Sequence, residues 1–153
     1  MTKAMDLPGL FREQPYSDMS EMIANDEVAQ AFGIRLIDWG KGWCRLSMEV
    51  RKGMLNAYGA AHGSVVYALA DCAFAIAGNS YATKSVALSV TISYRRQVTE
   101  GEQLLVEARE ESRGKTTTLC RMRVTNGDGK IVALADGISY LSRQQPWGQR
   151  NES

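Results

Sequence analysis

The sequence is short of residues that bind zinc, because it contains one histidine, His62, and three cysteines. The cysteines Cys44, Cys72 and Cys120 lie far apart and lack the paired spacing of metal ligands. We therefore expect no zinc site and no cofactor, and we expect the three thiols to be reduced and structural.

An excess of charge of one sign and a long hydrophobic run are also missing. The formal net charge is +1 and the charged residues are scattered, which argues against a nucleic-acid or membrane-surface partner. The N-terminus has no apolar core of signal-peptide length, and the longest apolar run is too short for a membrane span. These absences predict a cytoplasmic protein.

The residues that are present suffice for one compact domain, since 44% of the 153 residues are hydrophobic. We expect an N-terminal extension at residues 1–19, a domain at residues 20–143 and a flexible polar tail at residues 144–153. No internal repeat or low-complexity tract suggests a further division.

Hydrophobic spacing predicts one short amphipathic helix over residues 20–32, which Gly33 ends. Two β-favouring runs, 34–39 and 43–50, flank a Gly-Lys-Gly turn. The N-terminal part of the domain is therefore expected to form a helix followed by a β-hairpin.

The longest apolar segment, from about residue 63 to residue 81, is rich in alanine and free of proline, which predicts a central helix covered on most sides. Hairpin turn signals separate four strand candidates that follow, at 85–95, 103–110, 116–125 and 131–141. We expect these strands to form an antiparallel meander. The whole pattern predicts an α+β fold, in which a curved antiparallel sheet of about six strands wraps one long helix.

Asp71 is the only charged residue between positions 65 and 77. A carboxylate in such surroundings loses hydration at a substantial cost in free energy unless another group compensates. It can simply bond to nearby backbone, but acids with perturbed pKa values cluster at functional sites. Asp71 is therefore the leading candidate for a functional residue.

The spacing Asn56-x-x-Gly59-x-x-His62-Gly63, then Leu69-Ala70-Asp71, then Asn79-Ser80 surrounds this helix. From about residue 25 to the last predicted strand, the chain resembles the hotdog-fold thioesterases, most of all the PaaI-type acyl-CoA thioesterases of phenylacetate degradation. The resemblance implies hydrolysis of an aryl-acetyl-CoA or medium-chain acyl-CoA without a cofactor. It also implies sites formed between the protomers of a homodimer or homotetramer.

Thioester hydrolysis needs a polarised carbonyl and a nucleophile or an activated water. Gly63 opens the central helix, where an unpaired amide and the helix dipole would stabilise an oxyanion. Asp71 is either the nucleophile or the general base that activates water. The resemblance implies that Asn56 orients Asp71 or the water, and that His62 hydrogen-bonds locally and shapes the helix entry.

The spacing of Gly63 and Asp71 carries a geometric consequence. They are eight residues apart on one helix, about 12 Å at about 1.5 Å per residue, which is too far to act on one carbonyl carbon. If they cooperate, they must come from different subunits with antiparallel helices. This geometry predicts an isologous dimer with two sites.

Binding of a nucleotide phosphate requires cationic side chains near the pocket. Arg113 and Lys115, in a predicted tight turn, are the first candidates, and Arg95 or Arg96 are the second. Ser64 replaces the second glycine of a pair frequent in the family, so its hydroxyl either contacts substrate or caps the helix. The strand end that is often Arg-Pro in the family reads Arg95-Arg96-Gln97 here.

Two other functions fit parts of the pattern. A hotdog hydratase or dehydratase would use a histidine as its main acid or base, and His62 is the only histidine available. A non-catalytic acyl-CoA-binding module would need no acid at position 71. Release of free thiol separates both alternatives from a thioesterase.

Overall fold

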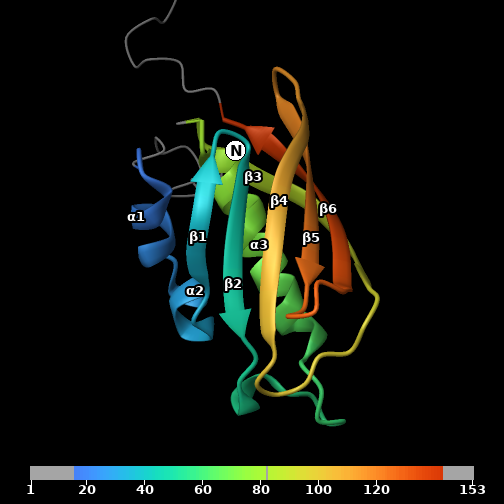
Figure 1. Ribbon diagram of the computed structural model, residues 1–153. Helices are drawn as coiled ribbons and strands as arrows, with labels where there is room; N and C mark the ends of the chain where they lie inside the picture. Colours follow the sequence, from blue (N-terminus) through green and yellow to red (C-terminus); the bar gives the residue numbers. More distant parts are fainter. Residues whose placement is uncertain (1–15, 82, 143–153) are drawn as a thin grey trace, which may run out of the picture.

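The computed structural model describes residues 16–81 and 83–142. Most of the expected N-terminal extension and all of the expected tail at 144–153 therefore lie outside the described residues. A six-stranded antiparallel sheet curves around one long helix (Figure 1), as the sequence predicts. In chain order the elements are α1 (Met19–Ala24), α2 (Glu27–Phe32), β1 (Arg35–Gly40), β2 (Trp43–Glu49), η1 (Lys52–Met54), α3 (Gly63–Asn79), β3 (Ser85–Tyr94), β4 (Gln103–Arg113), β5 (Thr117–Thr125) and β6 (Ile131–Leu141).

The strand order is β1-β2-β4-β5-β6-β3, so the expected four-strand meander is wrong at one position. Strands β4, β5 and β6 do form a meander, but β3 pairs with β6 at the edge, and β2 takes the place beside β4. The cause is the connection between β3 and β4, which runs across the end of the sheet. Val98 in this connection is buried and accepts a hydrogen bond from the Ala61 amide at 2.7 Å, and the Gly101 amide donates to the Val50 carbonyl at 2.8 Å.

The expected single helix at residues 20–32 is two short helices, which is a second correction. The side chain of Asp26 accepts a hydrogen bond from the Ala29 amide at 2.9 Å and caps the start of α2. An aspartate that bonds to the backbone in this way starts a new helix rather than continuing the old one. Gly33, with φ 65°, ends α2 as predicted.

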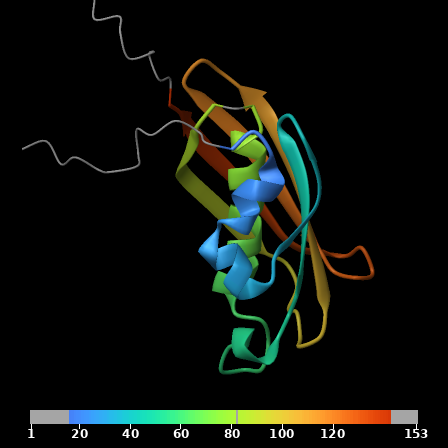
Figure 2. The same ribbon diagram turned by 90° about the vertical axis from the view of Figure 1, so that its left-hand side faces the viewer.

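Helix α3 packs against the concave face of the sheet, and α1 and α2 lie along its other side (Figure 2). Small residues allow the close approach that the sequence suggests. A Cβ at Gly78 would lie 2.7 Å from the Ser85 hydroxyl, and a Cβ at Gly137 would lie 2.8 Å from the Phe74 ring. Helix and sheet therefore share one core.

Coverage of α3 is incomplete along one stripe. Its exposed or half-buried positions after Gly63 are spaced three or four residues apart along one helix face; they are Ser64, Tyr67, Ala68, Asp71 and Ala75. The candidate acid therefore lies on the side of α3 that the described residues leave open.

The cysteines have the structural character that the sequence predicts. All three thiols are buried and unpaired. Burial raises the pKa of each thiol, in the case of Cys72 and of Cys120 to about 12, so they are protonated and unreactive near neutral pH. In residues 16–81 and 83–142, no helix combines the length and the apolar character needed to cross a membrane.

Candidate active site

The start of α3 leaves one backbone donor available to a ligand. His62 is the N-cap: its ring Nδ1 accepts a hydrogen bond from the Ser64 amide at 3.1 Å, and its carbonyl accepts from Val65 at 2.9 Å and Val66 at 3.4 Å. No residue in the described part of the chain accepts a hydrogen bond from the Gly63 amide. An unpaired amide at the positive end of a helix dipole is a site for negative charge.

The hydrogen bond from the Ser64 amide also fixes the tautomer of the His62 ring. A backbone amide can only donate, so Nδ1 carries no proton and the proton of the neutral ring is on Nε2. The Ser64 hydroxyl lies 2.7 Å from the same Nδ1, so it contacts the side chain that caps the helix. A contact of Ser64 with substrate stays a prediction. The local hydrogen bond that the resemblance implied for His62 is therefore present.

Asn56 orders the turn that precedes α3. Its side-chain oxygen accepts hydrogen bonds from the backbone amides of Tyr58 at 2.9 Å and Ala60 at 3.2 Å. The backbone amide of Asn56 donates to the Ala60 carbonyl at 2.7 Å. Because the oxygen is engaged twice, the side-chain NH₂ is the end of Asn56 that can serve a ligand. That group can only donate hydrogen bonds.

A cavity of about 350 Å³ joins these groups at the N-terminal end of α3. Among its lining residues are Asn56, Gly63, Tyr94, Arg95 and Arg96. The structure thus brings together the predicted oxyanion donor Gly63, the side-chain amide of Asn56, and Arg95 and Arg96, the second candidates for phosphate binding. Tyr94 was missed by sequence reasoning, and its only signal was its place at the end of a predicted strand, next to Arg95.

Asp71 lies two turns further along α3, about 12 Å from Gly63 at about 1.5 Å per residue, and it does not line the cavity of its own chain. Burial raises the pKa of the Asp71 carboxyl, and the negative charge of Asp26 raises it further. A raised pKa makes a carboxylate a stronger base. This separation of Asp71 from Gly63 is the one from which a site shared by two subunits was predicted. The catalytic role of Asp71 stays a prediction.

Asp26 is a second carboxylate that sequence reasoning missed. Besides capping α2, it accepts a hydrogen bond from the thiol of Cys72, the residue after Asp71, at 3.9 Å. Its only sequence signal was that aspartate is a favoured N-cap residue. It lies 45 positions before Asp71 in the chain, and only the packing of α2 on α3 brings the two acids near each other.

Replacement of Asp26 by asparagine is expected to lower the pKa of Asp71, because it removes a neighbouring negative charge that opposes ionisation. Asparagine is an equally good N-cap, so α2 should remain intact. A ¹³C NMR titration of the Asp71 carboxyl measures the effect. Asp38→Asn, at an exposed position of β1, is the control and should leave the midpoint unchanged. An unchanged midpoint in the Asp26 variant would show that the charge of Asp26 does not raise the pKa of Asp71.

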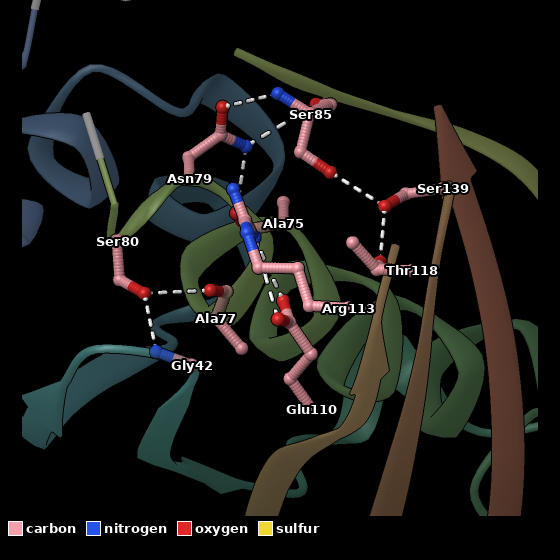
Figure 3. A network of polar contacts seen from close by, with 10 residues as sticks. All are labelled: Gly42, Ala75, Ala77, Asn79, Ser80, Ser85, Glu110, Arg113, Thr118 and Ser139. Atoms are coloured by element: carbon pink, nitrogen blue, oxygen red, sulfur yellow. Dashed lines mark hydrogen bonds and ion pairs between the residues drawn. The ribbon is translucent and has the colours of Figure 1, made fainter. Parts of the chain in front are cut away.

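Arg113 lies at the other end of α3. Its guanidinium pairs with Glu110 at 3.0 Å and stacks over the Tyr81 ring at 4.0 Å (Figure 3 shows the pair). The Glu110 side chain is 4% exposed, and burial raises the pKa of its carboxyl although Arg113 opposes the shift. Arg113, Glu110 and Tyr81 lie near the C-terminal end of the 17-residue helix α3, whose first residue is Gly63. The two ends of α3 are about 24 Å apart at about 1.5 Å per residue. Arg113 and the neighbouring Lys115 therefore do not meet the cavity of their own chain.

Asn79 and Ser80 fasten the end of α3 (Figure 3). The Asn79 carboxamide oxygen accepts from the Ser85 amide at 3.0 Å, and the Ser80 hydroxyl accepts from the Gly42 amide and donates to the Ala77 carbonyl, each at 2.7 Å. These bonds tie the helix to β3 and to the turn between β1 and β2. Asn79 and Ser80 therefore hold the C-terminal end of α3 in place.

Comparison with known proteins gives the same family. The Thioesterase superfamily model matches residues 58–133. The acyl-coenzyme A thioesterase PaaI of Escherichia coli is 36% identical over 78% of this chain and 85% of its own. Its solved structure matches with a TM-score of 0.80 at 34% identity, over 84% of this chain and 93% of that one. A putative esterase of Archaeoglobus fulgidus is 37% identical over 78% of this chain and 77% of its own.

A further solved structure, that of smu.793 from Streptococcus mutans bound to acetyl CoA, has a TM-score of 0.70 at 27% identity and covers 74% of this chain and 91% of that one. The long helix wrapped by a six-stranded curved sheet is the hotdog fold of thioester hydrolases. The chain belongs to the thioesterase superfamily, as a hotdog thioesterase of the PaaI type.

Proposed function

We propose that the protein hydrolyses the thioester bond of an acyl-CoA to a carboxylic acid and free coenzyme A. The observation that carries this proposal is the unpaired amide of Gly63, a residue that lines a cavity together with Asn56. Donors placed in this way stabilise the negative charge that develops on a thioester oxygen under attack. The name of the Escherichia coli relative and the acetyl CoA bound by the Streptococcus mutans protein support the substrate class.

Asp71 supplies the attacking group in one of two ways. As a nucleophile it forms a mixed anhydride and expels the thiolate, and water then hydrolyses the anhydride. As a general base it takes a proton from the water that attacks the carbonyl directly. The raised pKa of Asp71 favours both roles, while the Asn56 NH₂ holds the water or the acid, and the His62 cap holds the start of α3.

The site is completed by a second copy of the chain. An antiparallel pairing of two α3 helices about a two-fold axis places Asp71 of the partner subunit near Gly63 and forms two equivalent sites. Two features within residues 16–81 and 83–142 support this dimer: the stripe of α3 that carries Asp71 is left uncovered there, and β3 is a ten-residue edge strand with a partner on one side only. A homotetramer formed by two such dimers, through the outer face of the sheet, is supported by the exposed neighbours Leu119 and Ile138.

The phosphates of coenzyme A are bound by basic residues at the cavity mouth. Arg95 is at the cavity of its own chain, and Ser64 is at the first turn of α3. In an antiparallel dimer, the C-terminal end of α3, beside which Arg113 lies, points toward the cavity of the other subunit. This keeps Arg113 and the neighbouring Lys115 as candidates. A cytoplasmic location is supported by the three free thiols.

A thiol-release assay over a panel of acyl-CoA substrates, from short aliphatic to hydroxylated phenylacetyl groups, tests the proposal. We expect the preferred substrate to give a kcat/KM of at least about 10⁴ M⁻¹ s⁻¹. Tight binding of acyl-CoA with no thiol released would instead indicate a binding module. A change in enoyl absorbance without thiol release would indicate a hydratase or dehydratase.

A further inference from the structure

Tyr94 joins the end of the edge strand β3 to the first residue of α3. Its hydroxyl donates a hydrogen bond to the Gly63 carbonyl at 2.9 Å, across 31 positions of sequence. Its ring also lies against Gly63: a Cβ at position 63 would be 3.2 Å from the ring Cζ and 3.3 Å from the hydroxyl oxygen. Tyr94 and Gly63 both line the same cavity.

This contact acts where the helix is otherwise least constrained. The first residue of a helix has few hydrogen bonds to hold it, and glycine has more backbone freedom than any other residue. The cap by His62 holds the amides of residues 64–66 but does not bond to the amide of Gly63. Tyr94 is the side chain that bonds to Gly63 from outside the helix.

The protonation of the Tyr94 hydroxyl and the exposure of the residue both suit a side chain that holds Gly63 in place. Burial raises the pKa of the Tyr94 hydroxyl, so it is protonated near neutral pH and can donate. The side chain is nevertheless 50% exposed, so little of the core depends on it. A residue that contributes little burial but bonds to the oxyanion donor's own residue is better placed to orient that donor than to hold the fold together.

We propose that Tyr94 is a positioning residue for the oxyanion donor: its hydroxyl holds the Gly63 backbone so that the amide faces the cavity, and its ring crowds any side chain at position 63. The proposal rests on the proposed thioester hydrolysis. It assigns to Tyr94 no contact with the reacting atoms.

The first test is Tyr94→Phe, which removes the hydroxyl and keeps the ring. Loss of one hydrogen bond that orients a transition-state donor is expected to lower kcat about threefold to tenfold with KM unchanged. Tyr140→Phe is the matched control, because Tyr140 is a sheet tyrosine that is 46% exposed; its kcat should equal that of the wild type. Both variants should keep the wild-type melting temperature.

Several outcomes would overturn the proposal. An unchanged kcat means that the hydroxyl positions nothing, and a raised KM at unchanged kcat means that Tyr94 binds substrate instead. A second readout needs no turnover: the ¹⁵N order parameter of the Gly63 amide should fall in Tyr94→Phe. If the wild type releases no thiol but the order parameter falls, the proposed function fails while the contact is upheld. An unchanged order parameter refutes the positioning role itself.

The second test concerns the ring. Gly63→Ala is expected to lower kcat about a hundredfold in the wild type, but about threefold or less in a Tyr94→Ala background, where the ring is gone. Circular dichroism confirms that each variant is folded. Equal losses in the two backgrounds would show that Tyr94 does not determine the need for glycine.

Discussion

The Asp71→Asn enzyme is expected to lose at least about a thousandfold in kcat, because asparagine can serve neither as nucleophile nor as general base. Asparagine has nearly the same shape as aspartate, so packing on α3 should not change. Burial and the charge of Asp26 already disfavour the ionised Asp71 carboxylate. A neutral amide should therefore leave the melting temperature unchanged or raise it.

The measurement is thiol release by the purified variant, with circular dichroism and thermal unfolding recorded on the same sample. Asp128→Asn, in the exposed turn between β5 and β6, is the matched control and should retain wild-type kcat. If Asp71→Asn kept the wild-type kcat, Asp71 would have no catalytic role. A lower melting temperature would instead assign a structural role to the carboxylate.

Mixed dimers are expected to regain activity that neither parent variant has. Gly63→Val should be nearly inactive, because its side chain would meet the Tyr94 ring, which lies 3.2 Å from the Cβ position, and would crowd the oxyanion donor. A dimer of one Gly63→Val chain and one Asp71→Asn chain has two unequal sites. One site carries both defects, and the other combines the intact Gly63 with the intact Asp71, so the mixed dimer should show about half of the wild-type activity.

Co-expression of the two variants with different affinity tags, followed by tandem purification, gives the mixed dimer without either parent. Thiol release per dimer is then compared with that of each homodimer, and native mass spectrometry verifies the composition. An inactive mixed dimer would mean that both groups act within one chain. An active monomer in sedimentation experiments would contradict the two-subunit site in a second, independent way.

Much of the fold could be predicted from the sequence because the signals are local. The apolar length of residues 63–81 predicted α3, which ends two residues earlier, at Asn79. The hairpin and the later strands followed from alternation and from turn residues such as Gly42, which has φ 76°. Strand β4, however, extends three residues beyond its predicted end, to Arg113. The availability of the Gly63 amide followed from its place at a helix start, and the family from the spacing around Asp71.

The place of β3 and the surroundings of Arg113 depend on tertiary contacts, whereas the break between α1 and α2 is a local capping contact. The break between α1 and α2 depends on the hydrogen bond that the Asp26 side chain accepts from the Ala29 amide. The place of β3 at the sheet edge depends on a connection fastened to residues 50 and 61 rather than on any turn. Arg113 pairs with Glu110 near the far end of α3, and its part in phosphate binding stays a prediction.

By itself, the sequence determined most of the elements, the fold class, the family and the two groups on α3 with which the chemistry is proposed. Helix periodicity and motif spacing are properties of neighbouring residues. Tertiary structure alone decided which strand lies at the edge, that Asp26 raises the pKa of Asp71, and that Tyr94 bonds to Gly63. These contacts join residues that are 31 or more positions apart. Such pairs meet only when burial of the shared core brings their elements together, so no local pattern encodes them.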